Sequence, residues 1–384
     1  MQFQELKEYI DALNPDIVPG CEIIVAQNHQ RLFHYTHGFA DFNRQKPVSE
    51  TNLYFLYSAT KIFTCTAGAQ LLERGLLRLE DPVQKYLPEF GELYVKSGDA
   101  LRPAQTVLTV RHLFTMCGGY TYDLGNEHIV ALQKQTNNQA TTRQMLGAIA
   151  KIPLVFDPGA AFRYSLCHDI LAGIIEVISG LTFGEYLKQN IFAPLGITEM
   201  GFRPTPEVLS RMSAQYLYNF NLKKAEPTTL TNPFALSNNY ESGGAGLIGG
   251  ARDYILLADA LACGGVGKTG NRILNPQTVN LLRQNHLTPA QFKTFCKPNT
   301  GYSYGLGVRT KIKQQSNNCY SPLGEFGWDG AAGAYIMIDP ENALSIFYVQ
   351  HVRNNSEIYD TVHPMLRDLT YKALGKEQEH YEKN

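Results

Sequence analysis

The sequence predicts a mixed α/β (α+β) fold in which one sheet is completed by both ends of the chain. Residues that favour strands alternate or cluster at both ends, whereas the middle is helical and rich in loops. The strand-like segments are 21–26, 31–37, 304–312, 333–338 and 343–350. We therefore expect a sheet domain formed by residues 1–78 and 250–384, with residues 79–249 inserted as a mainly helical lobe.

Helices are predicted at both ends of the chain and throughout its middle. Apolar residues recur at helical spacing between residues 3 and 13, and a hairpin with a polar loop at 27–30 follows. Further helical patterns cover 62–74, 110–116, 142–149, 169–178, 183–190, 252–262 and 357–373. Prolines and glycines between residues 79 and 104 predict loops there.

Composition excludes several classes of function. The chain has 384 residues, 44% of them hydrophobic, and a net charge of -1, which fits a globular protein of two lobes at about 150 residues per domain. A binder of nucleic acid or of membrane surfaces needs a basic excess, which is missing. No apolar run approaches the roughly 18–20 residues of a membrane span. The first residues lack the pattern of a signal peptide, so we expect a cytoplasmic protein.

The cysteines and histidines predict neither a disulfide framework nor a metal site. The seven cysteines are an odd number without CxxC spacing, which is typical of free thiols in a reducing compartment. The histidines show no metal-ligand spacing. We therefore expect no metal and no cofactor, and nothing in the sequence indicates an oligomeric state.

The segment Tyr57–Lys61 is the first candidate for a catalytic motif. A serine at the start of a helix is usually an N-cap, because its oxygen accepts an orphan backbone N–H. However, residues i and i+3 share one helical face, so Ser58 and Lys61 would point into the same cleft. A buried lysine of lowered pKa can activate such a serine for acyl transfer. This tetrapeptide alone leaves both interpretations open.

Two glycine-rich segments imitate nucleotide-binding motifs in unsuitable contexts. Residues 244–249 fit G-x-G-x-x-G, but no apolar strand precedes them and no acid follows at the spacing of a ribose ligand. Residues 264–269 resemble a P-loop whose first glycine is replaced by Ala262, and a helix precedes them instead of a strand. An ATPase therefore remains only a distant alternative.

Two further segments imitate motifs of serine enzymes. Residues 301–305 fit the G-x-S-x-G nucleophile elbow around Ser303, but polar residues precede them and a strand follows, so a loop entering a strand is favoured. Residues 268–270 spell K-T-G, a motif that must lie on a strand lining the cleft. They stand between two predicted helices, and we interpret the match as coincidence.

An ordered set of motifs runs through most of the chain. It comprises SATK at 58–61, TVRHLFTMCGG at 109–119, FDPGAAFRYS at 156–165 and FGWDGAAG at 326–333. From about residue 38 to 350 the sequence resembles the serine β-lactamase-like superfamily: class C β-lactamases, DD-peptidases of the penicillin-binding protein type and, most closely, family VIII esterases. The resemblance implies an antiparallel sheet flanked by helices, with the active site between the two domains.

The resemblance also implies roles for individual residues. Ser58 would be the nucleophile, Lys61 its proton partner, and Tyr164 the tyrosine that passes protons to the leaving group and activates the deacylating water. The oxyanion hole would use the backbone N–H groups of Ser58 and of Ala331, which follows Gly330. Losing one such donor typically raises the barrier by roughly 2.7–4 kcal/mol.

The sequence departs from the family pattern at two motifs. Leu166 replaces the asparagine of Tyr-x-Asn, which removes the amide that would hold an acyl amide. Trp328 and Asp329 replace the lysine and threonine of Lys-Thr-Gly, so a substrate carboxylate loses a cationic partner worth roughly 1.5–3 kcal/mol. Asp329 would either face the substrate as an anion or lie at the strand edge facing solvent. Leu166, Tyr120 and Tyr122 are candidates for the acyl pocket.

These departures favour a neutral, apolar substrate. We expect a serine hydrolase that works through an acyl-enzyme, most simply a carboxylesterase acting on small or medium esters. A β-lactamase or D-amino-acid peptidase acting on an amide is the nearest alternative, and an acyltransferase would differ only in its acceptor. A non-catalytic binding relative is a more distant one.

Overall fold

The structure is a computed structural model that describes residues 2–295, 300–314 and 319–376. Within these residues, seven strands form one antiparallel sheet in the order β2-β1-β13-β12-β11-β10-β9. The strands are β1 (Gly20–Gln27), β2 (Gln30–Gly38), β9 (Tyr302–Tyr304), β10 (Arg309–Lys311), β11 (Phe326–Asp329), β12 (Tyr335–Asp339) and β13 (Leu344–Gln350). The N-terminal β1 pairs with the C-terminal β13, which confirms the predicted fold class.

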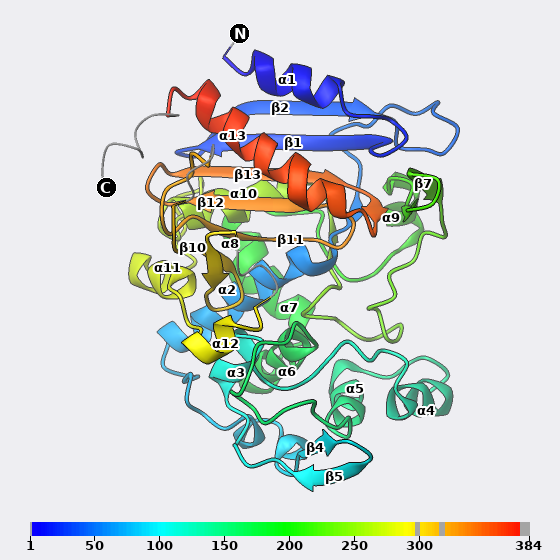
Figure 1. Ribbon diagram of the computed structural model, residues 1–384, viewed down its shortest axis with the longest axis vertical. Helices are drawn as coiled ribbons and strands as arrows, with labels where there is room; N and C mark the ends of the chain where they lie inside the picture. Colours follow the sequence, from blue (N-terminus) through cyan, green and yellow to red (C-terminus); the bar gives the residue numbers. More distant parts are fainter. Residues whose placement is uncertain (1, 296–299, 315–318, 377–384) are drawn as a thin grey trace.

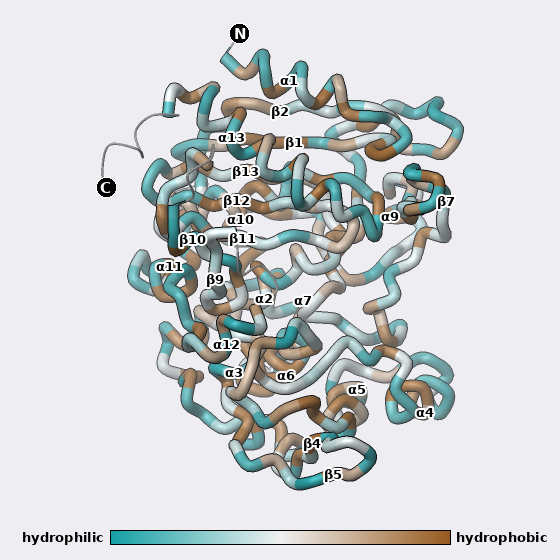
Figure 2. The backbone as a smooth tube through the Cα atoms, viewed as in Figure 1, coloured by the Kyte–Doolittle hydropathy of each residue, from teal (hydrophilic) through white to brown (hydrophobic). Residues whose placement is uncertain are grey.

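Helices cover both faces of this sheet because its central strands are apolar on both sides. On one face, α1 (Gln4–Asp11) and α13 (His363–Ala373) pack over Ile23 and Val25 (Figure 1). On the other, α10 (Ala251–Ala262) stacks Tyr254 on Phe347 with ring centroids 4.1 Å apart. Figure 2 shows apolar residues recurring along the strands and along the helices below them.

The helices of the middle segment lie below the sheet in Figure 1. They include α3 (Val110–Phe114), α4 (Glu127–Gln135), α5 (Thr142–Ile149), α6 (Cys167–Ser179) and α7 (Phe183–Leu187). The buried helix α2 (Thr60–Glu73) packs against α6. Strand β6 (Tyr216–Asn219) instead pairs with β7 (Lys224–Pro227) on one side and with the C-terminal β14 (Val352–Arg353) on the other. The division of the chain at residues 78 and 249 therefore stays a prediction.

The remaining short elements complete the chain. They are β3 (Tyr54–Phe55), β4 (Tyr94–Ser97), β5 (Ala100–Pro103), β8 (Ile248–Gly249), α8 (Ala193–Leu195), α9 (Pro206–Arg211), α11 (Pro276–Arg283) and α12 (Pro289–Phe292). No single helix of the described residues is long and apolar enough to cross a membrane; α6 and residues 183–195, which bend by 74°, pass that test only as a pair.

Several segments differ from the predicted pattern. The single strand expected over 304–312 is two strands, because the chain turns at Gly307, whose φ is +86° and where a Cβ would lie 2.0 Å from the Cys65 sulfur. The segment expected to form loops contains the β4–β5 hairpin. The last predicted helix begins with a π-helical turn, Ile358–Val362, before α13.

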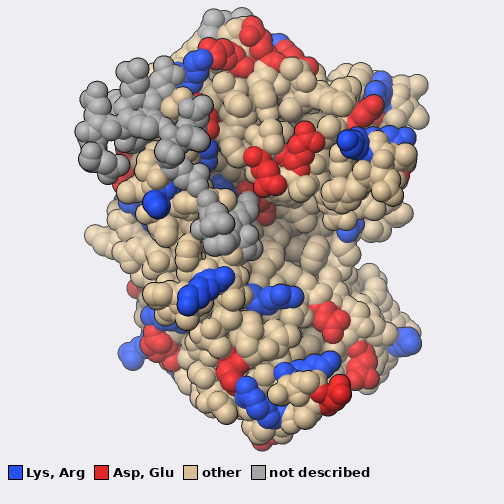
Figure 3. All heavy atoms as spheres, viewed as in Figure 1, with Lys and Arg blue, Asp and Glu red and all other residues tan. Residues whose placement is uncertain are grey.

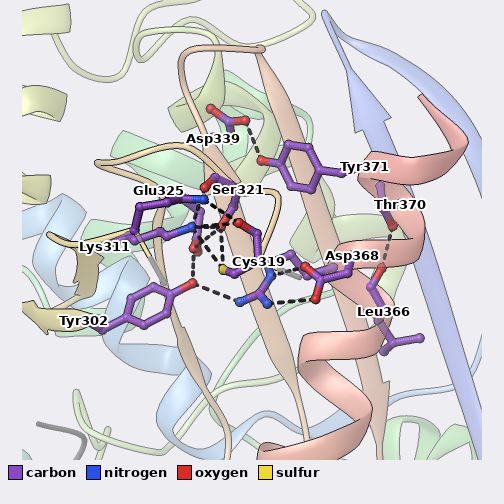
Figure 4. Close-up of polar contacts among 12 residues, drawn as sticks. Tyr302, Lys311, Cys319, Ser321, Glu325, Asp339, Leu366, Asp368, Thr370 and Tyr371 are labelled. Atoms are coloured by element: carbon purple, nitrogen blue, oxygen red, sulfur yellow. Dashed lines mark hydrogen bonds and ion pairs between the residues drawn. The ribbon is translucent and has the colours of Figure 1, made fainter. Parts of the chain in front are cut away.

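A buried polar network fastens α13 to the sheet edge (Figure 4). Arg367 of α13 donates to the Tyr302 hydroxyl over 3.2 Å, and Tyr302 in turn donates to Glu325. Lys311 of β10 donates to the Ser321 hydroxyl over 3.2 Å. Burying charged groups is costly unless they are paired, so the contact of Arg367 with Tyr302 favours the docked position of α13.

The surface carries both signs of charge. Figure 3 shows basic and acidic side chains interspersed over the upper and lower halves of the face in view. The six described cysteines are free thiols, and Cys296 lies outside the described residues.

Candidate active site

Ser58 lies in a tight turn between β3 and α2. Tyr57, just before it, has a φ of +47°, a left-handed conformation that costs a non-glycine residue on the order of 1–3 kcal/mol. The Tyr57 side chain is buried and donates to Gln215 over 2.5 Å, which holds the turn in place. Ala59, and not Ser58, is the N-cap residue of α2, and among the described residues no side chain caps this helix. The interpretation of Ser58 as a helix cap is therefore wrong.

Lys61 lies in the first turn of α2 and is completely buried. Its Nζ donates to Ser58 Oγ over 3.3 Å, to the Tyr122 hydroxyl over 2.9 Å and to the Gly244 carbonyl over 2.6 Å. Burial lowers the pKa of Lys61 to about 7, although the nearby Asp169 carboxylate opposes the shift. The structure thus places an amine that is readily deprotonated beside the serine hydroxyl.

The Tyr164 ring also packs on Lys61. The Lys61 Nζ lies 4.5 Å from the centre of the Tyr164 ring. The Tyr164 hydroxyl accepts a hydrogen bond of 2.9 Å from the Trp328 indole, and the two rings lie 5.4 Å apart. The structure therefore brings Ser58, Lys61, Tyr164 and Trp328 together.

Tyr122 has a more direct contact with Lys61 than the sequence indicates. It follows the glycine pair after α3, and its ring packs against Tyr164 at 5.6 Å and Phe234 at 5.2 Å. Burial raises the pKa of Tyr122 well above its ordinary value, so the hydroxyl stays protonated. A tyrosine on a loop carries no spacing signal that would reveal this contact with Lys61.

The glycine-rich segment 242–250 supplies backbone to the site. The buried Asp169 of α6 accepts hydrogen bonds from Tyr240 (2.7 Å), Ser242 (2.6 Å) and the Gly244 N–H (3.3 Å). A Cβ on Gly244 would lie 2.5 Å from an Asp169 oxygen and 3.2 Å from the Tyr122 hydroxyl. Only glycine fits at position 244, because the backbone there lies against Asp169 and Tyr122. In this position the Gly244 carbonyl points at Lys61.

Strand β11 ends beside the Ser58 turn. A Cβ on Gly330 would lie 2.5 Å from the Leu56 carbonyl, so glycine lets β11 approach the turn closely. Asp329 is only 14% exposed and pairs with the buried Arg309 over 2.9 Å. It is therefore not a free strand-edge charge, and Arg309 neutralises it. Ala331, next along the chain, is half-buried.

Two residues predicted for the pocket belong to the core. Leu166 and Tyr120 are 2% and 1% exposed and pack among the apolar residues of the main hydrophobic cluster. An open cavity of about 780 Å³ next to the site is lined by Tyr122 and Tyr164 together with Phe156 and Phe162, but by neither Ser58 nor Lys61. Of the candidate aromatic residues in the loop after α3, only Tyr122 lines it.

The rejected motifs lie elsewhere. Ser303 is buried on β9 and donates to Asn285 over 2.7 Å, which is unlike a nucleophile at a strand-to-helix turn. Thr269 lies in a turn between α10 and α11 and donates to the Pro194 carbonyl over 2.8 Å. The element before the imitated P-loop is the helix α10, so the strand that the motif requires is not there.

An antiparallel sheet with helices on either face, and a serine–lysine turn that lies beside the end of strand β11, characterises the β-lactamase/transpeptidase fold. The chain belongs to the beta-lactamase family, whose family model matches residues 8–363. The family resemblance expected from the motifs is thereby confirmed.

Known relatives include both hydrolases and acyltransferases. The chain is 27% identical to monacolin J acid methylbutanoyltransferase of Aspergillus terreus, over 92% of this chain and 90% of the relative. It is 25% identical to EstCE1, a hydrolase with promiscuous acyltransferase activity, with a TM-score of 0.77 over 96% of this chain and 97% of that one. A family VIII carboxylesterase shares the fold at 18% identity, with a TM-score of 0.75 over 97% of each chain.

Proposed function

We propose that the protein is a serine hydrolase acting through an acyl-enzyme, and specifically a carboxylesterase for small or medium neutral esters. The observation that carries this proposal is the buried Lys61 amine, 3.3 Å from Ser58 Oγ and with a pKa of about 7. An amine titrating near neutrality can accept the serine proton at working pH, which an ordinary lysine cannot.

The reaction divides into two halves. Ser58 Oγ attacks the ester carbonyl while Lys61 takes its proton, and the backbone N–H groups of Ser58 and Ala331 stabilise the oxyanion. Tyr164 then protonates the departing alcohol, which leaves the acyl group on Ser58. A water molecule then gives a proton back to Tyr164 and attacks the acyl-enzyme. Ser58 Oγ leaves with the proton held on Lys61, which releases the acid and restores the free enzyme. No metal or cofactor is needed for this sequence of steps.

The residues around the nucleophile favour a neutral substrate. Trp328 stands where the related penicillin-recognising enzymes carry a lysine, and its indole N–H is occupied by Tyr164. The Asp329 carboxylate is held by Arg309, so neither sign of free charge is offered at the end of β11. An aromatic wall and a neutralised strand end suit an apolar acyl or alcohol group.

Acyl transfer is the second candidate function. It shares every step up to the acyl-enzyme and differs only when an alcohol replaces water as the acceptor. The similarity to a methylbutanoyltransferase and to a hydrolase with promiscuous acyltransferase activity favours it specifically. Adding an alcohol to an ester assay and measuring the new ester against the free acid distinguishes the two.

The nucleophile is tested by labelling with a fluorophosphonate. We expect one covalent adduct on Ser58, detected by mass spectrometry of the digested protein. Ser58→Ala should abolish both the adduct and hydrolysis of p-nitrophenyl esters, whereas Ser303→Ala should leave both largely intact. A label on Ser303, or full esterase activity in Ser58→Ala, would contradict the assignment.

The substrate class is tested by comparing two kinds of acyl donor. We expect short-chain p-nitrophenyl esters to have a higher kcat/KM than a chromogenic cephalosporin, because Trp328 and Asp329 offer no cation to the cephalosporin carboxylate. Steady-state kinetics on the same preparation measure this ratio. Faster turnover of the cephalosporin would favour the β-lactamase alternative.

A further inference from the structure

Three different metal-binding side chains meet where the β1–β2 hairpin turn touches helix α10. They are His29 in the turn, Asp259 on α10 and Cys263 at the C-terminal cap of α10, and their ligand atoms all lie within 4.8 Å of one another. His29 is 230 residues away from Asp259 in the sequence, so ligand spacing along the chain does not reveal the group. Asp259 and Cys263 are four residues apart and therefore share one face of α10.

We propose that His29, Asp259 and Cys263 form a binding site for a divalent zinc-like cation. Imidazole, carboxylate and thiolate are together the ligand types of zinc, whereas magnesium and calcium select oxygen ligands alone. Binding forms one bond each to nitrogen, oxygen and sulfur, and releases the thiol proton to solvent. This proposal is independent of the proposed esterase function.

A modest rearrangement would fit these residues around such an ion. His29 and Asp259 have to move slightly apart, whereas Cys263 already lies near the required distance from the carboxylate. Bonds of about 2.0–2.3 Å in tetrahedral geometry separate ligand atoms by roughly 3.3–3.8 Å. In the structure His29 Nδ1 lies 2.7 Å from Asp259 Oδ2, and Cys263 Sγ lies 3.9 Å from Asp259 Oδ1. The ion would replace the hydrogen bond between His29 and Asp259, with the ring proton on Nε2.

The backbone at His29 gives a second, independent observation. Asn28 and His29 have φ values of +49° and +64°, the conformation of a two-residue hairpin turn whose second position favours glycine. Histidine occupies the glycine position there, at the expense of backbone strain. Its backbone N–H also donates to Asp259 over 3.1 Å, which fixes the turn against α10.

The site combines a buried anchor with access from solvent. The Asp259 side chain is 6% exposed, whereas that of His29 is 31% exposed. Cys263 is also partly exposed, unlike the other described cysteines. A cation can therefore enter from solvent, and the open side leaves room for water as a fourth ligand. Bound there, it would clamp the hairpin turn to the helix behind the sheet.

The test uses the full-length protein after removal of metal with a chelator. We expect one zinc ion per chain by calorimetry, an increase in Tm with added zinc, and no increase with magnesium or calcium. Cobalt in place of zinc should give a thiolate-to-cobalt charge-transfer band, because Cys263 supplies a sulfur ligand. That band should disappear in Cys263→Ser.

His29→Gly is the decisive variant, because glycine suits the turn and keeps the protein folded. We expect its zinc affinity to fall at least about tenfold. Removing a residue that only supports a metal ligand already lowers metal affinity by about 10–100-fold, and His29 would be a ligand itself. His37→Gln is the matched control, since His37 also lies near a carboxylate, 3.4 Å from Asp11, and its zinc affinity should not change. Unchanged zinc binding in His29→Gly, a cobalt band that survives in Cys263→Ser, or no binding of one ion per chain would overturn the proposal.

Discussion

Lys61 is the residue whose surroundings most directly determine the chemistry of the candidate active site. It is buried, and the groups that accept its hydrogen bonds are uncharged hydroxyl and carbonyl oxygens. The Asp169 carboxylate does not contact the amine directly; it binds the N–H of Gly244, whose carbonyl contacts Lys61. Desolvation therefore dominates over charge attraction and destabilises the ammonium form. A general base with a pKa near the working pH is the outcome.

The first residue-scale prediction concerns the pH dependence of ester hydrolysis. The base must be deprotonated to accept the Ser58 proton, so kcat/KM should rise with pH, level off above about 7 and fall about tenfold per unit below it. Lys61→Met should lower kcat by about 10²–10⁴. Both are measured with a p-nitrophenyl ester over a buffered pH series.

The matched control for this prediction is Lys268→Met. Lys268 is exposed in the turn between α10 and α11, and its removal should leave the pH profile unchanged. A profile that stays flat between pH values of about 6 and 8, or an equal loss of activity in both variants, would contradict the role of Lys61.

At the residue scale, the sequence predicts those site residues that are related by a fixed spacing or by the order of motifs. Ser58 and Lys61 are three residues apart at a helix start, and motif order identifies Tyr164 and Trp328. The contacts of Lys61 with Tyr122 and Gly244 depend on loops brought together by folding, which no local period reports. Burial likewise separates Tyr120 and Leu166 from the cavity, although both look equally suitable in the sequence.

Among the elements, β10 and β11 form the strand pair that carries charge next to the site. Arg309 of β10 contacts Asp329 at 2.9 Å and Glu325 at 3.7 Å, and it donates to the Ile336 carbonyl over 2.8 Å. Its side chain is 5% exposed. The Arg309 guanidinium therefore contacts two carboxylates and a backbone carbonyl of β12. These contacts fix the end of β11 beside the Ser58 turn.

We predict that Arg309→Met destabilises the protein by about 3–5 kcal/mol, because it leaves the Asp329 carboxylate without its buried partner. Adding Asp329→Asn should recover part of that loss, since the neutral amide no longer needs a cation. Urea unfolding of the wild type, both single variants and the double variant completes the cycle. Strictly additive losses would show that the two residues do not interact.

Element prediction succeeded where periodicity is uninterrupted and failed where tertiary contacts shape the chain. The helix expected over 142–149 is α5 with the same bounds, because a Thr141 capping box marks its start. The strand expected over 304–312 breaks at Gly307, which is held against Cys65 of α2. In the β4–β5 hairpin the apolar residues stand next to each other, at Tyr94–Val95 and Ala100–Leu101, so its sequence lacks the alternation that predicts a strand.

For the whole molecule, the hydrophobic core joins the two predicted domains. One cluster contains Phe347 and Ile24 from the sheet together with Leu146 and Ile174 from the inserted helices. Helix α2 runs through this cluster, buried along nearly its whole length. The two predicted lobes therefore share one apolar interior, so neither can lose its structure without exposing the surface of the other.

We therefore predict one cooperative unfolding transition for the entire chain. Trp328 is the only tryptophan, and it lies on β11 against Tyr164 of the inserted segment, so its fluorescence reports the contact between the two parts. Far-UV circular dichroism reports the helices of both parts. In urea the two signals should change with the same midpoint, because the shared core couples them. If the fluorescence changed at a clearly lower urea concentration than the dichroism, the two lobes would separate before they unfold, and residues 79–249 would be an independent domain.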